Sequence, residues 1–242
     1  MKHRQGTSLI AIAAVSFIII SSLLCGCADL DGICEPTEPL PVQTPLPSPP
    51  QTALGSKTVV IDAGHGGQDG GAVGRITGVK EDGINLSVAL LLKDKLEQLG
   101  FTVIMTRTSD SALADAKKDD MKMRRDIMNQ DGVSIVVSIH MNKFSDTSIK
   151  GPMAFYMKGS AEGERLATSI ICALCDALGN PRRLANPGDY FVIRESVPPA
   201  VIVECGFLSN ADDEKLLQTA EHQSKLVEGI AAGITAYFGG GE

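Results

Sequence analysis

The sequence predicts a single α/β domain in which helices flank both faces of a mostly parallel, twisted sheet. Two observations predict this fold. From about residue 57 onward, short β-branched runs alternate with longer runs whose apolar residues recur at helical spacing, as in consecutive strand–helix units. The run at residues 133–139 reads as a nearly continuous apolar strand, which is typical of a strand covered on both faces of a sheet.

The expected elements follow one another from residue 58 to residue 238. A strand at residues 58–61 precedes a leucine-rich helix, and Gly100 follows that helix at a position that glycine often occupies after a helix C-terminus. The remaining elements are a strand, a helix, two strands, a helix, a strand and the closing helices, expected at residues 101–105, 121–128, 133–139, 153–157, 162–178, 200–203 and 215–238.

The first 27 residues have the layout of an export signal. A basic start precedes an uncharged run at residues 8–24, and Cys25-Gly26-Cys27 follows that run. Three interpretations stay open: a cleaved signal, a lipid anchor with Cys27 as the modified residue, and an uncleaved membrane anchor. Each of them predicts a protein that acts outside the cytoplasm.

Residues 28–56 predict a linker between this segment and the domain. They hold seven of the twelve prolines of the chain, which disfavours both helices and strand ladders. The linker is therefore expected to be extended, with the catalytic domain at residues 57–240 and a membrane tether through the N-terminus.

Composition and cysteine spacing give no support for a nucleic-acid partner and disfavour a redox or four-cysteine zinc motif. A net charge of −7 gives no support for a nucleic-acid partner. Cys172 and Cys175 have the spacing of a redox or zinc motif, but no second pair accompanies them and they fall within a predicted helix. They are expected to be buried structural thiols, and Cys205 is the third cysteine of the domain.

Three of the predicted strands lead into an ionisable residue. His65 follows the first strand, His140 ends the strand at residues 133–139, and Glu204 ends the strand at residues 200–203. Taken singly, a histidine after a strand is more often a hydrogen-bonded loop residue than a ligand. Parallel strands, however, bring their carboxyl ends to one edge of the sheet, where binding sites form. Glu81, at the start of the leucine-rich helix, adds a second carboxylate close to this edge.

Two histidines and one carboxylate are the usual protein ligands of catalytic zinc. The residues therefore predict a Zn²⁺ site with His65, His140 and one carboxylate, and the other carboxylate could then move a proton. The glycine-rich segment at residues 64–74 could instead bind phosphate, but it lacks the P-loop Lys-Ser/Thr and a G-x-G-x-x-G that opens a helix. Its glycines are expected to let the backbone bend closely around a metal ligand.

Four stretches occur in order between residues 57 and 238: VVIDAGHGGQDGGAVG, EDGINLSVALLLKDKLEQLGFTVIMTRTSD, VVSIHMNKFSD and PPAVIVECGFLSNADDEKLL. Together they resemble the zinc-dependent N-acetylmuramoyl-L-alanine amidases of bacteria, the Amidase_3 family. The resemblance implies that His65, Glu81 and His140 are the zinc ligands and that Glu204 is the catalytic residue. Two residues depart from the family pattern, Ala63 in place of proline and Asp82 in place of lysine, and neither change removes a ligand.

The resemblance implies a hydrolase that cuts the amide between N-acetylmuramic acid and L-alanine in peptidoglycan. Glu204 would take a proton from water and deliver it to the leaving nitrogen, since an amide nitrogen leaves poorly unless it is protonated. The chain is most similar to the spore-cortex, CwlD-type, amidases, which prepare muramic acid for δ-lactam formation. A helper or activator protein stays open as a partner. The alternatives are a zinc peptidase or deacetylase acting on another wall amide, and a non-catalytic scaffold.

Overall fold

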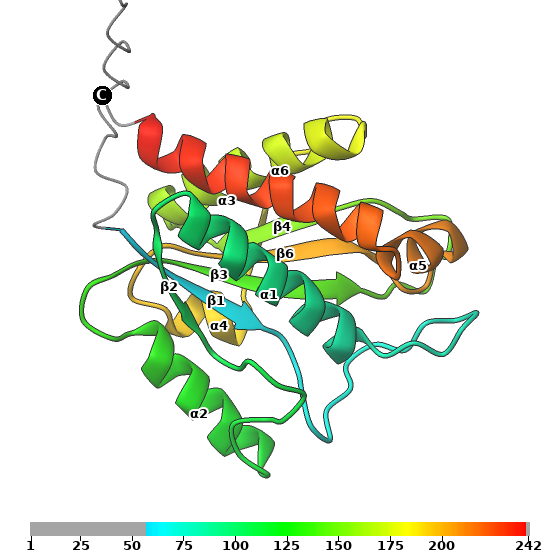
Figure 1. The fold of residues 1–242 in the computed structure, drawn as a ribbon, viewed down its shortest axis with the longest axis horizontal. Coiled ribbons are helices and arrows are strands. Elements are labelled where there is room, and N and C mark those ends of the chain that lie inside the picture. The colour runs from blue at the N-terminus through cyan, green and yellow to red at the C-terminus, as the bar shows by residue number, and fades with distance from the viewer. Residues whose placement is uncertain (1–56, 241–242) are drawn as a thin grey trace, which may run out of the picture. The chain divides into compact units, whose positions relative to one another are not determined.

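The computed structural model describes residues 57–240, which lie in one compact unit (Figure 1). It confirms the predicted α/β class, with a six-stranded sheet and helices on both faces. The elements in chain order are β1 (Thr58–Ala63), α1 (Glu81–Gln98), β2 (Thr102–Met105), α2 (Lys117–Met128), β3 (Val133–Asn142), β4 (Met153–Met157), α3 (Ala161–Leu178), β5 (Asn186–Gly188), α4 (Phe191–Glu195), β6 (Ala200–Phe207), α5 (Ala211–Leu217) and α6 (Ala220–Gly239).

The strands are arranged in the order β2-β1-β3-β6-β4-β5. The four strands from β2 to β6 in this order are parallel to one another, as predicted. Only β4 runs antiparallel to its neighbour β6, and β5 then pairs with β4 in parallel. The carboxyl ends of β1, β3 and β6 therefore meet at one edge near the middle of the sheet.

Side chains alternate between the two faces of the sheet, because successive residues of a strand point to opposite sides. One face, with Val137 and Val203, packs against α1, α3 and α6 in the larger core cluster. The other face, with Val136 and Ile202, packs against α2 and the short α4 in the smaller cluster. Figure 1 shows these two groups of helices on opposite sides of the sheet.

Two strands extend further than the sequence predicted. The predicted ends were the polar residues His140 and Glu204, but β3 continues to Asn142 and β6 to Phe207. Met141, Cys205 and Phe207 beyond these positions are buried, and His140 pairs directly with Glu204 in the ladder. The prediction that these two residues terminate their strands was therefore wrong. Each lies two or three residues before the end of its strand.

Two elements were not predicted at all, β5 and α4. β5 consists of Asn-Pro-Gly, a composition that indicates a turn, and it forms only because β4 offers an open edge. α4 has five residues, too few to show a helical period. Both are consequences of tertiary contacts rather than of local sequence.

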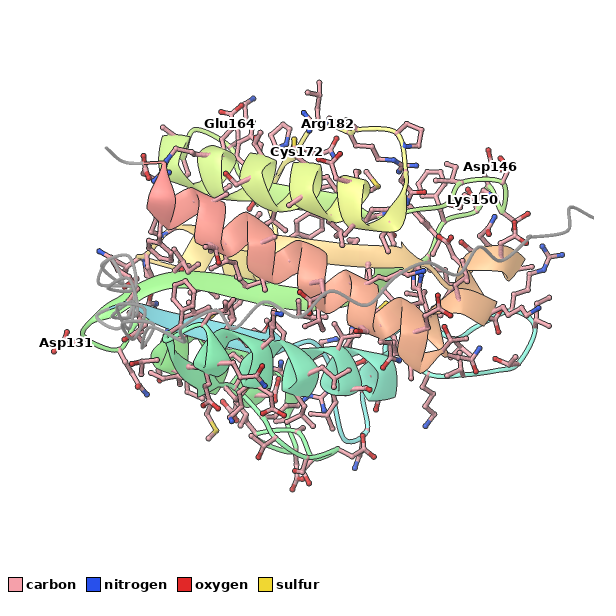
Figure 2. All side chains as sticks on the ribbon, turned by 45° about the horizontal axis from the view of Figure 1, so that its top comes forward. Asp131, Asp146, Lys150, Glu164, Cys172 and Arg182 are labelled. Carbon is pink, nitrogen blue, oxygen red and sulfur yellow. The ribbon has the colours of Figure 1, made fainter. Side chains whose placement is uncertain are left out.

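The three cysteines of the described domain are free thiols. Cys175 and Cys205 are buried, and Cys172 is only partly buried on α3, where Figure 2 labels it. The expectation of buried thiols at Cys172 and Cys175 is thus confirmed for Cys175 alone. The predicted export segment and linker lie outside the described residues. Within residues 57–240, no helix combines the length and the apolar character needed to cross a membrane.

Packing between α3 and α6 leads to a stability prediction. A Cβ atom added to Gly233 of α6 would lie 2.5 Å from the Cα atom of Ile170 in α3. Overpacking by Gly233→Ala should therefore lower the free energy of unfolding by about 1–3 kcal/mol. The better helix propensity of alanine should offset up to about 1 kcal/mol of this loss. Gly83→Ala in α1 is the matched control, because no neighbour lies within 4 Å of its added Cβ. Urea unfolding that ranks Gly233→Ala at or above Gly83→Ala in stability would contradict this account of the α3–α6 contact.

Candidate active site

The site lies at the carboxyl edge of β1, β3 and β6. His140 of β3 and Glu204 of β6 are register partners, so their side chains lie next to each other on one face of the sheet. By strand alternation this is the face covered by α2 and α4. His65 lies two residues beyond β1, and Glu81 is the first residue of α1. Three elements and the loop after β1 thus contribute one ionisable side chain each.

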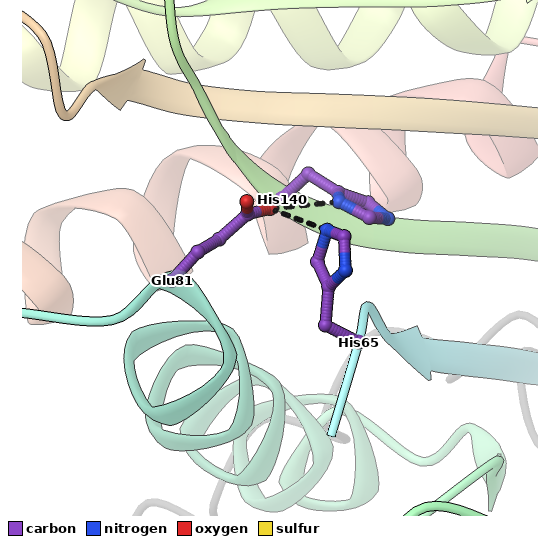
Figure 3. A group of neighbouring side chains, drawn as sticks. All are labelled: His65, Glu81 and His140. Atoms are coloured by element: carbon purple, nitrogen blue, oxygen red, sulfur yellow. Dashed lines mark hydrogen bonds and ion pairs between the residues drawn. The ribbon is translucent and has the colours of Figure 1, made fainter. Parts of the chain in front are cut away.

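Three of these side chains converge on one point, as Figure 3 shows. Oε1 of Glu81 lies 2.8 Å from Nδ1 of His140 and 3.3 Å from Nε2 of His65. One nitrogen of each imidazole and one carboxylate oxygen all lie within 4.8 Å of one another. Ligand atoms bonded at about 2.0–2.2 Å to a tetrahedral zinc lie roughly 3.3–3.6 Å apart, so the Glu81–His65 spacing fits such a site and the 2.8 Å Glu81–His140 contact would lengthen slightly if zinc bound.

Glu81 is held in place by its own surroundings. Its side chain is buried, Oε2 accepts a hydrogen bond from the backbone N–H of Ala72 (2.7 Å), and Oε1 accepts from Met141 N (3.1 Å) and Asn85 Nδ2 (3.2 Å). The carboxylate therefore cannot swing away from the histidines without losing several hydrogen bonds. Burial would raise the pKa of Glu81, but its contacts with His140 and His65 outweigh burial and lower it. The carboxylate is ionised at neutral pH, as a metal ligand must be.

Two glycines let the backbone approach the side chains of the cluster closely. A Cβ atom on Gly64 would collide with the ring of His140, and one on Gly71 would lie 2.5 Å from Oε2 of Glu81. Gly71 also has φ of +66°, a conformation that other residues rarely adopt. The close bending predicted for the glycines of this segment is observed at these two positions, around the side chains of His140 and Glu81.

Two buried arginines bind the backbone that carries His65. Arg107 donates to the carbonyls of Ala63 and Gly64 (both 2.9 Å), and Arg124 donates to those of Ala63 (2.9 Å) and His65 (2.6 Å). His65 needs such support, because its φ of +63° is the only positive value at a non-glycine residue among those described. Asp62 balances the charge of Arg124 through a 2.8 Å ion pair.

Glu204 differs from Glu81 in how one of its carboxyl oxygens is surrounded. Its Oε2 is buried and has no hydrogen-bond partner within residues 57–240. Burial raises the pKa of Glu204 to about 7, and the charge of Glu81 adds to the increase while that of the two histidines opposes it. A carboxyl group whose pKa lies near neutrality can both accept and donate a proton at working pH.

A cavity of about 300 Å³ opens beside Glu204. Polar groups of the site, among them Glu204, His140 and His65, form one part of its wall. Apolar side chains from α2, α4 and β6 form the other part: Met121, Phe191, Val192 and Ile202. The arrangement places the carboxyl of Glu204, the two histidines of the cluster and an apolar wall around one open space.

A family model described as N-acetylmuramoyl-L-alanine amidase, Amidase_3, matches residues 59–236. The chain belongs to this family. It is an N-acetylmuramoyl-L-alanine amidase, a hydrolase of cell-wall peptidoglycan. The cluster of His65, Glu81 and His140 is consistent with the metal site of the zinc amidases of this family.

Individual relatives agree with this assignment. The amidase is 34% identical over 194 residues to the germination-specific N-acetylmuramoyl-L-alanine amidase of Bacillus subtilis, an alignment that covers 76% of this chain and 81% of the relative. Among solved structures, it is similar to the CwlD amidase of Clostridioides difficile in complex with the GerS lipoprotein (TM-score 0.72, 32% identity, 76% of this chain and 98% of that chain). The catalytic domain of CwlV from Bacillus (Paenibacillus) polymyxa is also similar, with a TM-score of 0.69 and 34% identity. That alignment covers 76% of this chain and 98% of the CwlV chain.

The structure brings together all four residues that the sequence singled out. His65, Glu81 and His140 form the cluster, and Glu204 lies in register with His140. Sequence reasoning missed most of the groups that support them, namely Asp62, Asp69, Arg107 and Arg124. A signal existed for Asp69, since it lies four residues after His65 in the same glycine-rich segment. The arginines gave none, because Arg124 lies 59 residues from the carbonyl of His65 that it binds.

Proposed function

We propose that this amidase uses one zinc ion, held by His65, Glu81 and His140, to cut the bond between the lactyl group of N-acetylmuramic acid and L-alanine. The observation that carries the proposal is the convergence of these three side chains beside Glu204, whose Oε2 is buried without a hydrogen-bond partner in the described domain. Two imidazoles and a carboxylate are the ligand set that leaves a fourth position open on catalytic zinc.

Glu204 is the proposed general acid–base. When bound, zinc would polarise the scissile carbonyl and lower the pKa of the attacking water. Oε2 of Glu204 would accept the proton of that water and then deliver it to the departing alanine nitrogen. Its buried position favours both steps, because a pKa raised to about 7 lets the same group act as base and as acid.

We also propose a role in maturation of the spore cortex, where cleavage would prepare muramic acid for δ-lactam formation. Support comes from the similarity to a germination-specific amidase and to CwlD. The neighbouring CwlD structure is a complex with a lipoprotein, so a helper protein of that kind belongs to the proposal. An N-terminal export and anchor segment followed by the proline-rich linker would tether the catalytic domain outside the cytoplasm.

Digestion of purified peptidoglycan by the full chain, supplied with zinc and followed by mass spectrometry, tests the proposal. The expected products are stem peptides with a free L-alanine amino group and muramic acid with a free lactyl carboxyl group. Cuts within the stem peptide would identify a peptidase, and loss of acetyl groups would identify a deacetylase. A digest of spore-cortex material beside vegetative material tests the cortex role: a higher rate on cortex supports it, and a preference for vegetative material contradicts it.

A further inference from the structure

His65 has a second polar partner besides Glu81. Its Nδ1 lies 3.0 Å from Oδ2 of Asp69, whereas its Nε2 faces Glu81. We propose that Asp69 is a positioning residue for the metal centre: its carboxylate accepts the Nδ1–H of His65 and so directs Nε2 toward the metal. Histidine ligands are commonly oriented by a carboxylate in this way, which fixes both the tautomer and the ring plane. The inference rests on the proposed zinc site.

The carboxylate of Asp69 is itself held in a fixed place. Asp69 closes a tight turn with Gly66, in which Gly66 N donates to Asp69 O (2.9 Å) and Asp69 N donates to Gly66 O (3.2 Å). Its Oδ1 accepts from the backbone N–H of Gly71 (3.2 Å). The turn and this hydrogen bond leave Oδ2 directed at the imidazole of His65.

The two histidines differ in how much orientation they need. His140 lies on β3, where the ladder and its neighbour Glu204 fix its backbone. His65 lies in a loop with a left-handed backbone, which the arginines secure only through its carbonyl. No strand backbone fixes the orientation of the His65 ring, and the contact with Asp69 fixes it instead. Within residues 57–240, His140 has no comparable carboxylate on its second nitrogen.

Lys117, the first residue of α2, donates to Oδ2 of Asp69 at 2.7 Å. The side chain of Lys117 is 71% exposed and that of Asp69 is 37% exposed. An ion pair this open to solvent is screened and contributes little. The geometry therefore ranks the two residues: loss of Asp69 should weaken metal binding strongly, and loss of Lys117 should weaken it only slightly.

The test measures zinc affinity of the full chain by competition with a chelator, in the absence of substrate. Asp69→Ala should raise the zinc Kd about 10–100-fold, and Lys117→Met should stay within about threefold of wild type. Asp69→Asn keeps an oxygen that can accept from Nδ1–H, so its Kd should fall between those of Asp69→Ala and wild type. Asp115→Ala is the matched control, since Asp115 is exposed, lines the same cavity of about 580 Å³ as Asp69, and forms no ion pair with His65 among the described residues.

Two further readouts separate positioning from folding. The visible absorption spectrum of the cobalt-substituted chain reports ligand geometry, and Asp69→Ala should change it whereas Asp115→Ala should not. The melting temperature of the metal-free Asp69→Ala chain should fall by only about 2–4 °C, because the lost Gly71 hydrogen bond of a partly exposed residue costs about 1 kcal/mol. If Asp69→Ala does not fold, the zinc Kd and the cobalt spectrum of Asp69→Asn are compared with those of Asp115→Ala instead.

Zinc Kd values for the Asp69 variants within about threefold of Asp115→Ala, with unchanged cobalt spectra, would overturn the positioning role while leaving the proposed function intact. A wild-type chain that binds no zinc would overturn the proposed function, and this inference with it.

Discussion

Replacement of His140 by alanine is expected to abolish stoichiometric zinc binding and to reduce amidase activity to background. His140 supplies one of three converging ligand atoms, and its Nδ1 lies only 2.8 Å from the Glu81 oxygen. A site left with one imidazole and one carboxylate loses the ligand number and geometry that zinc requires. Metal analysis of the purified wild-type and His140→Ala chains measures the first effect, and peptide release from peptidoglycan measures the second.

His222→Ala is the matched control for this prediction. His222 lies in the first turn of α6 and does not belong to the cluster, so the same substitution there should leave zinc content and activity near wild type. Circular dichroism should show that His140→Ala retains its secondary structure, because His140 is at the carboxyl edge of the sheet rather than in either core cluster. Equal, stoichiometric zinc in wild type and His140→Ala would refute the ligand assignment.

The fold could be predicted because its main signals are local. The helical spacing of leucines in α1 and the apolar runs of β1 and β3 are visible within single windows of sequence. The same signals place His65 and His140 near strand ends, and the parallel topology then brings them to one edge. Ladder register could not be read in this way, so the sequence placed the ends of β3 and β6 too early.

The supporting contacts of the site could not be predicted because they are long-range. Arg124 reaches the carbonyl of His65 from another element, and the 62-residue separation between Arg124 and Asp62 gives no pattern in a local window. α4 forms one wall of the cavity although its five residues show no period. Ionisable residues at the edge of the sheet were thus predictable, but their orientation and pKa depend on the assembled fold.

Glu204→Gln is expected to lower amidase activity by about 10²–10⁴-fold, the usual contribution of a general acid–base. Glutamine keeps the size of the side chain and can form hydrogen bonds, but it cannot accept a proton from water. Folding should be unaffected, because Oε2 of Glu204 has no hydrogen-bond partner within the described domain that the substitution would break. Zinc content should also stay near wild type, since Glu204 lies beside the three-residue cluster and not within it.

The pH profile and a control variant distinguish proton transfer by Glu204 from a structural role. Burial raises its pKa to about 7 in the metal-free chain, and the charge of a bound cation would lower that pKa. The base form is lost as pH falls through this pKa, so wild-type activity should decline on the acid side, and Glu204→Gln should lack that decline.

Glu195→Gln, on the neighbouring α4, should behave as wild type because Glu195 pairs with Arg194 away from the cluster. Loss of zinc in Glu204→Gln would make Glu204 a ligand and displace Glu81 from that role, whereas unchanged hydrolysis would place the proton transfer on another group.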